Sequence, residues 1–134
     1  MPSGREWHGV AGASDEALGR LQAACPRELP ASYVALLSFS NGGEGPLPVQ
    51  PLWVCLDSAE TVSEALVKST HEEFFPGFFV FGSNGGGEYL ALDMRKAAPF
   101  PVVSIDMTNI DLRESVMTVA TDFSAFVELI GLDG

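Results

Sequence analysis

Two cysteines and two histidines are the residues best suited to nucleophilic or metal chemistry, and their spacing supports little of either. The run His71-Glu72-Glu73-Phe74-Phe75 begins like the helix of a zinc protease, but Phe75 stands where the second histidine is required. Cys25 and Cys55 form no Cys-x-x-Cys pair and sit among apolar neighbours, which is typical of buried thiols. We therefore predict no metal site and no cofactor. A Cys55–His71 dyad, and with it a small hydrolase, stays an open alternative because a sequence does not reveal adjacency in space.

Acid and base catalysis by paired carboxylates is the second chemistry to consider. The candidates are Glu88, Asp93, Asp106 and Asp111. The chain has 18 acidic residues, so carboxylates are widely scattered, and we expect these four at solvated strand ends and turns. No Asp-x-Asp-x-Asp-Gly calcium loop is present. The glycine-rich run 82–87 lacks the Gly-Lys-Ser/Thr ending of a phosphate-binding loop and leads into a predicted strand, which favours a hairpin connection.

The charge balance indicates the class of partner. The formal net charge is −11, from 18 acidic against 7 basic side chains, and the basic residues are dispersed along the chain. Such a surface repels nucleic-acid phosphates and anionic lipid headgroups, because binding either requires clusters of Lys and Arg. We therefore expect neither nucleic acid nor a membrane as partner, and we expect any protein drawn by this field to be basic.

Length and apolar content predict one domain over residues 1–134, with residues 1–13 as a poorly ordered or peripheral segment. Apolar residues make up 46% of the chain, enough to form a core without disulfide or metal. No run approaches the roughly 18 apolar residues of a membrane span. The first residues also lack the apolar core of a secretory signal, so we expect a cytoplasmic protein.

Four helices are predicted from their end signals. The first ends before Pro26, and the second is closed by Asn41-Gly42-Gly43. In the last, Phe123, Phe126 and Ile130 recur at helical spacing. The predicted caps are Ser14, Asp57 with Glu60 three residues later, and Asp122, and Pro30 is expected at the first position of the second helix.

Five β-prone runs are predicted to form strands: 52–56, 78–81, 89–92, 101–106 and 116–120. Residues 44–51 hold three prolines and are expected to form a surface loop. The order of elements lacks the regular alternation of a doubly wound sheet. We therefore predict an α+β fold with a twisted, mostly antiparallel sheet and helices packed on it.

The phenylalanines between residues 74 and 81 outnumber what a half-buried strand requires. Phe79 and Phe81 would share one strand face and Phe78 and Val80 the other, which predicts a central strand covered on both sides. The alternative is an exposed aromatic anchor for a partner. Trp53 carries the same ambiguity on its own strand.

A helix followed by a glycine turn forms a recognisable motif, Leu29-Pro30-Ala31-Ser32-Tyr33-Val34-Ala35-Leu36-Leu37 with Asn41-Gly42-Gly43. In this motif the sequence resembles the SUKH superfamily of fungal cell-wall assembly regulators and bacterial immunity proteins. The resemblance continues through 52–53, 78–88, 90–93, 101–106 and 123–129, and so spans about residues 29 to 130.

The resemblance implies an α+β fold without known enzymatic activity. Bacterial members typically neutralise a toxin, often a nuclease, by binding it directly. We therefore expect an immunity protein that covers a basic toxin, with a regulatory adaptor for a cellular protein as the alternative. Trp53 is the expected anchor, with Glu44, Glu88 and Asp111 as acidic neighbours. Glu88 and Asp93 fall at polar positions of the family's motif and are interface candidates for that reason.

Overall fold

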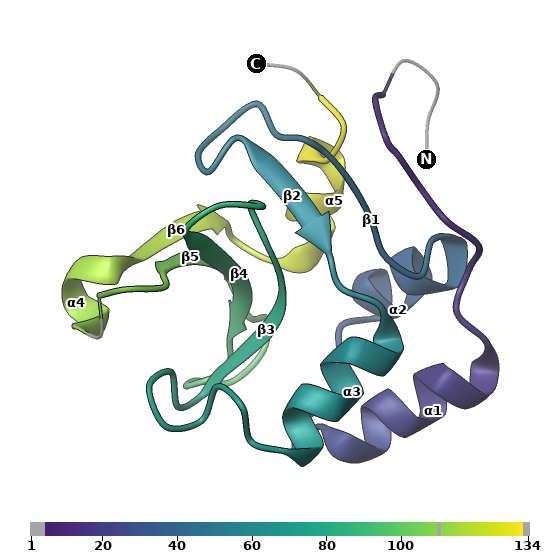
Figure 1. Cartoon of the computed structure of the whole chain (residues 1–134), viewed down its shortest axis with the longest axis horizontal. Helices are drawn as coiled ribbons and strands as arrows, with labels where there is room; N and C mark the ends of the chain where they lie inside the picture. Colours follow the sequence, from purple (N-terminus) through teal and green to yellow (C-terminus); the bar gives the residue numbers. More distant parts are fainter. Residues whose placement is uncertain (1–4, 110, 133–134) are drawn as a thin grey trace.

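A computed structural model describes residues 5–109 and 111–132. Over these residues the chain forms an open six-stranded sheet in which every pairing is antiparallel, so the predicted α+β class is confirmed (Figure 1). In sheet order, the strands are β1 (Gly43–Pro46), β2 (Trp53–Leu56), β3 (Phe78–Ser83), β4 (Glu88–Asp93), β5 (Val102–Asp106) and β6 (Val116–Ala120). The helices are α1 (Asp15–Ala24), α2 (Ala31–Phe39), α3 (Ala59–Val67), α4 (Leu112–Ser115) and α5 (Phe123–Leu129).

Side-chain caps set where α1, α3, α4 and α5 begin. The Ser14 hydroxyl oxygen accepts a hydrogen bond from the Ala17 amide at 3.1 Å. The Asp122 carboxylate accepts one from the Ala125 amide at 2.8 Å, so both predicted caps are confirmed. The predicted Asp57 cap is wrong by one residue, because Ser58 caps α3. Asp57 itself is still held at the sheet, where its amide donates to the carbonyl oxygen of Phe81 at 2.9 Å.

The turn after α2 leads directly into a strand that sequence reasoning missed. α2 begins at Ala31 with Pro30 as its N-cap, one position from the prediction. Gly42 and Gly43 have φ values of +113° and +112°, which favour glycine, and they redirect the chain into β1. The predicted surface loop 44–51 is therefore wrong at its start. Glycine and proline form strands poorly, and β1 exists because its backbone pairs with β2.

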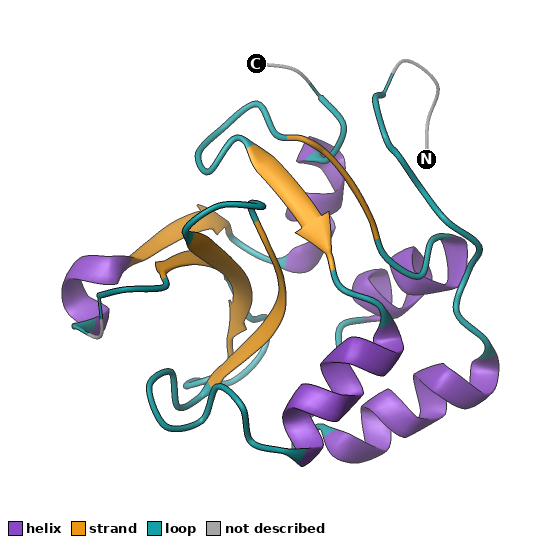
Figure 2. Ribbon diagram, in the orientation of Figure 1, coloured by secondary structure: helices purple, strands orange, loops and turns teal. Residues whose placement is uncertain are grey.

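Both faces of the sheet bury apolar side chains. The inner face joins α1, α2, α3 and α5 in the main core, to which β3 contributes Phe79 and Phe81. Phe78 and Val80 belong to a smaller cluster on the outer face. The prediction of a central strand covered on both sides is thus confirmed for β3. Figure 2 shows α1 and α3 packed together on one side of the sheet and α4 at the far side.

The outer cluster is covered by two short segments. Phe75, between α3 and β3, packs edge-on against Tyr89 with ring centroids 5.6 Å apart. Leu112 of α4 contacts the same cluster. Sequence reasoning missed α4, because four residues are too few to show a periodic apolar stripe.

The predicted peripheral segment 1–13 is described from Arg5 onward, and residues 1–4 lie outside the described range. We call residues 5–13 the N-terminal belt. His8 and Glu44 exchange both backbone hydrogen bonds, at 2.8 and 3.1 Å, in an antiparallel bridge. Further along, the Ala13 amide donates to the carbonyl oxygen of Leu37 on α2 at 2.8 Å. The belt therefore lies along the free edge of β1 (Figure 1).

Candidate protein-interaction surface

Most of the basic side chains bind groups within the chain itself. The four ion pairs with carboxylates are Arg20–Glu16, Lys68–Glu64, Arg95–Asp93 and Arg113–Asp111. Arg5 donates to two carbonyl oxygens at the end of α5, at 2.6 and 3.2 Å, and Arg27 to two in the β4–β5 connection, at 3.1 and 3.3 Å. Little positive charge is therefore left for a partner.

More carboxylates face solvent without a cationic partner among the described residues than form ion pairs. Its members include Asp15, Glu28, Glu44, Glu72, Glu73 and Glu128. Because six of the seven lysine and arginine side chains are already engaged, these carboxylates set the sign of the field around the molecule. The surface is therefore suited to a basic partner.

The structure brings together two of the five predicted binding residues. Glu44 on β1 lies opposite Cys55 on β2. Trp53 is two residues before Cys55 on β2, so the side chains of Glu44 and Trp53 share the outer face of the sheet. Glu44 is exposed and Trp53 is half-buried. A carboxylate beside a partly exposed indole combines the charge and the apolar area that anchor a basic protein.

The remaining three predicted binding residues have local partners and do not join this pair. Asp93 binds the Arg95 guanidinium through both carboxylate oxygens at 2.9 Å, and this bonding lowers the pKa of Asp93. Asp111 caps α4. Glu88 begins β4 and Asp93 ends it, which separates them by roughly 16 Å along the strand.

The thiol and imidazole of the hydrolase alternative lie in unfavourable surroundings. Cys55 pairs across the sheet with Glu44 and Ser83, and burial together with the Glu44 carboxylate raises the pKa of its thiol. A raised pKa favours the unreactive protonated form. The His71 ring packs edge-on against Tyr89 at 4.9 Å, and burial lowers its pKa. No hydrogen bond joins Cys55 to His71 among the described residues, so the geometry gives the dyad no support.

The geometry also gives no support to a hydrolase that uses paired carboxylates. Asp93 and Asp111 are engaged as described above, and Asp106 accepts hydrogen bonds from the amide and the hydroxyl of Thr108, both at 2.9 Å. Within residues 5–109 and 111–132, no three His, Cys, Asp or Glu side chains cluster closely enough to hold a metal ion. These carboxylates stabilise turns and a helix start.

A surface hollow of about 500 Å³ lies between the N-terminal ends of α2 and α5. Its lining includes Glu28, Pro30, Phe100 and Asp122, and none of the predicted binding residues.

In the described part of the chain, no helix is both long and apolar enough to span a lipid bilayer.

Asp57 is a titratable group that sequence reasoning misplaced as a cap. It follows β2 at the seam between β2 and β3, where only two residue pairs join the strands. Partial burial of the carboxyl raises the pKa of Asp57 from 3.8 to about 6. No local sequence signal distinguishes it, because burial here depends on how the two strands diverge.

Phe74 is the exposed member of the phenylalanine group, with 49% of its surface accessible, whereas Phe75, Phe78, Phe79 and Phe81 are buried. Exposed carboxylates on Glu72 and Glu73 precede it. The aromatic-anchor interpretation thus applies to this residue alone within the group.

Comparison with known protein families gives a match to this chain. The model of the SMI1 / KNR4 family (SUKH-1) matches residues 12–129, which include all five helices and all six strands described above. No curated protein matches the chain. The match extends further toward the N-terminus than the resemblance seen in the sequence, and it covers most of the 134 residues. The chain therefore belongs to the SMI1/KNR4 family (SUKH-1).

Proposed function

We propose that this protein is a non-enzymatic binding module that neutralises a basic toxin by covering it. Membership of the SUKH family supports this role, because members are commonly toxin immunity proteins. The observation that carries the proposal is the arrangement of charge: six of the seven lysine and arginine side chains bind groups of this chain, and unpaired carboxylates face solvent.

Charge and apolar anchors have different tasks in such a complex. An exposed ion pair contributes only about 0 to 1 kcal/mol, so the carboxylates mainly accelerate encounter and select a basic partner. A nanomolar complex requires about 12 kcal/mol, most of it from a few desolvated side chains. Trp53 beside Glu44 and Phe74 beside Glu72 and Glu73 are the places where such anchors meet negative charge.

The experiment is capture of the partner from native cells, followed by association kinetics in increasing salt. We expect a basic protein whose association rate falls at least tenfold between about 50 and 500 mM NaCl, because salt screens the steering field. Glu44→Lys should lower that rate. Glu128→Lys, on the exposed surface of α5, is the matched control and should lower it less. An association rate indifferent to salt and to both variants would contradict the proposal.

A further inference from the structure

Within the N-terminal belt, the Trp7 side chain is seated on two glycines of β1. Gly43 and Gly45 lie opposite Leu56 and Val54, both of which point into the main core. A Cβ atom on Gly45 would meet the Trp7 ring at 2.9 Å, and one on Gly43 would meet it at 3.0 Å. The Trp7 ring therefore fills the space that side chains would occupy on any other strand. These two glycines form a notch shaped for an indole.

Ser40 completes this notch with a buried hydroxyl group. Its oxygen accepts hydrogen bonds from the Val10 amide at 3.1 Å and from the Trp7 indole N–H at 3.4 Å. The hydroxyl donates to the carbonyl oxygen of Gly42 at 2.6 Å. Ser40 is fully buried, so these bonds satisfy a polar group that would be costly to leave unpaired.

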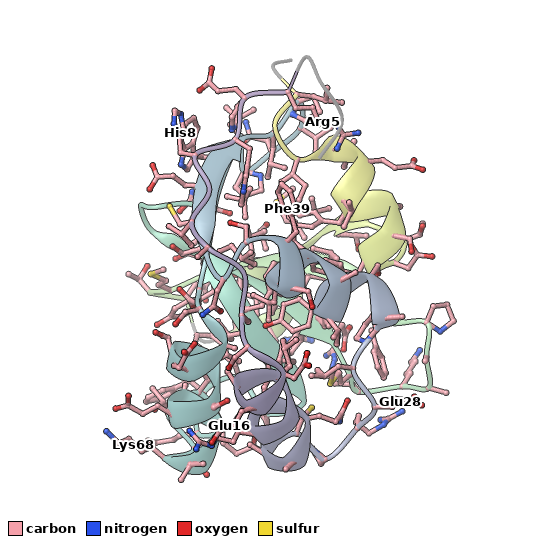
Figure 3. The ribbon with its side chains drawn as sticks, turned by 90° about the vertical axis from the view of Figure 1, so that its right-hand side faces the viewer. Arg5, His8, Glu16, Glu28, Phe39 and Lys68 are labelled. Atoms are coloured by element: carbon pink, nitrogen blue, oxygen red, sulfur yellow. The ribbon has the colours of Figure 1, made fainter. Side chains whose placement is uncertain are left out.

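The remaining contacts of the belt near Trp7 are made by its backbone. His8 and Glu44 exchange two hydrogen bonds, and the Glu6 amide donates to the carbonyl oxygen of Gly131 at 2.8 Å. The Glu6 and His8 side chains stay exposed. Figure 3 shows the belt running down this side of the molecule, with His8 at its outer margin. An extended peptide with tryptophan at the matching position could make the same contacts if it also has glycine at the positions of Gly9 and Gly12. A Cβ atom there would lie 3.1 Å from the Ser40 hydroxyl oxygen and 1.9 Å from the Ser38 carbonyl oxygen.

We propose that the β1 edge is a binding site for an extended, tryptophan-bearing peptide strand, and that the N-terminal belt is its resident, displaceable occupant. The glycine notch supplies the shape of the site and the Ser40 hydroxyl supplies a polar contact. The outer edge of β1, where the belt now lies, supplies main-chain pairing, as in other cases of strand addition. Trp7 and His8 precede the residues matched by the family, 12–129, whereas the notch lies within them. The inference goes beyond toxin binding and does not depend on it.

A tethered occupant has a large advantage over a free peptide. Its effective concentration at the site is on the order of millimolar, so a free strand competes poorly until the belt is weakened. The wild-type protein should therefore appear nearly inert toward added peptide. A chain whose own belt has lost the indole and the strand bridge should accept one.

The test uses the full chain with two substitutions in the belt, Trp7→Ala and His8→Pro. The first removes the indole from the notch, and the second removes the amide that donates to Glu44. The probe is a fluorescent synthetic peptide with the sequence of residues 5–13, followed by anisotropy. We expect saturable binding to the double variant, at least tenfold tighter than to the wild type. Circular dichroism and thermal melting establish that the variant is folded.

Two controls make the result specific to the notch. A peptide with alanine in place of its tryptophan should bind at least tenfold more weakly. Adding Gly45→Ala to the double variant should abolish binding, because its Cβ would lie 2.6 Å from the Glu6 carbonyl oxygen and 2.9 Å from the indole. Equal binding to wild type and double variant, no binding to a folded double variant, or no effect of Gly45→Ala would overturn the proposal.

Hydrogen exchange in the wild-type protein tests the same idea if the double variant does not fold. A displaceable belt must open without global unfolding. The His8 and Glu44 amides should therefore exchange at least tenfold faster than the slowest amides of β4. Exchange of both sets at one common rate would mean that the belt opens only when the whole protein unfolds, and would refute displacement.

Discussion

The β1 edge and the β3–β4 hairpin both depend on glycine, but for opposite reasons. In the hairpin, the Asn84 side chain accepts hydrogen bonds from the amides of Gly86 and Glu88 at 2.9 and 3.1 Å, so the turn is closed by its own residues. Gly87 has no atom within 4 Å of where a Cβ would lie. At the edge, Gly45 is confined by Trp7, a residue almost forty positions earlier. Glycine there permits close approach, whereas in the hairpin it permits a turn.

Adding one methyl group in each region tests whether glycine has different roles at the edge and in the hairpin. Gly45→Ala places a Cβ 2.6 Å from a backbone oxygen of the belt, and we expect it to lower the free energy of unfolding by about 2–3 kcal/mol. Gly87→Ala should change it by less than about 0.5 kcal/mol, because the space is open. Urea denaturation of the two variants measures both values. Equal losses would show that glycine has the same task at both places.

A smaller effect is expected from removing one hydroxyl in each region. Ser40→Ala deletes a buried hydroxyl that accepts two hydrogen bonds from the belt and donates one to Gly42. We expect it to lower the free energy of unfolding by about 2 kcal/mol. Ser83→Ala deletes one exposed hydrogen bond from the Gly85 amide and should cost about 0.5 kcal/mol. Thermal and urea unfolding distinguish these values. A greater loss for Ser83→Ala would reverse the account of which region depends on distant contacts.

A pH-dependent effect on stability is expected from Asp57, at the seam between the two regions. Its pKa in the folded protein, about 6, exceeds the ordinary value of 3.8, so its contribution to stability is present near pH 4 and is lost as pH rises through 6. Asp57→Asn should therefore be more stable than the wild type by about 1 kcal/mol at pH 7.5, allowing for the water that still reaches this carboxyl. The difference should vanish near pH 4. A difference independent of pH would show that the carboxyl is not buried as described.

Features encoded by neighbouring residues were predictable from the sequence. The caps Ser14 and Asp122, the glycine-rich hairpin and the two-sided strand β3 each depend on a few consecutive side chains. β1 was missed because Gly43–Pro46 has poor strand propensity and pairs only through its tertiary surroundings. Asp57 was assigned to a cap for the same reason, since its pairing with Phe81 is invisible to local rules.

The candidate surface was only partly predictable. Glu44 was expected as an acidic neighbour of Trp53, but the face that they share is set only by the pairing of β1 with β2. Asp93 was chosen for its place in the family's motif and Asp111 as an acidic neighbour of Trp53, but Arg95 and the start of α4 engage them. Sequence reasoning also gave no role to Trp7, because the two glycines that seat it lie far away in the chain.

We propose that this chain protects a cell by binding a basic toxin, and growth of a test strain tests that role directly. The partner captured from native cells is expressed there with and without this chain. The account predicts that the partner alone stops growth, and that co-expression of this chain restores it without chemical change to the partner. A partner that is harmless alone, or one whose toxicity persists beside this chain, would contradict the claim, and a harmless partner would favour a regulatory adaptor.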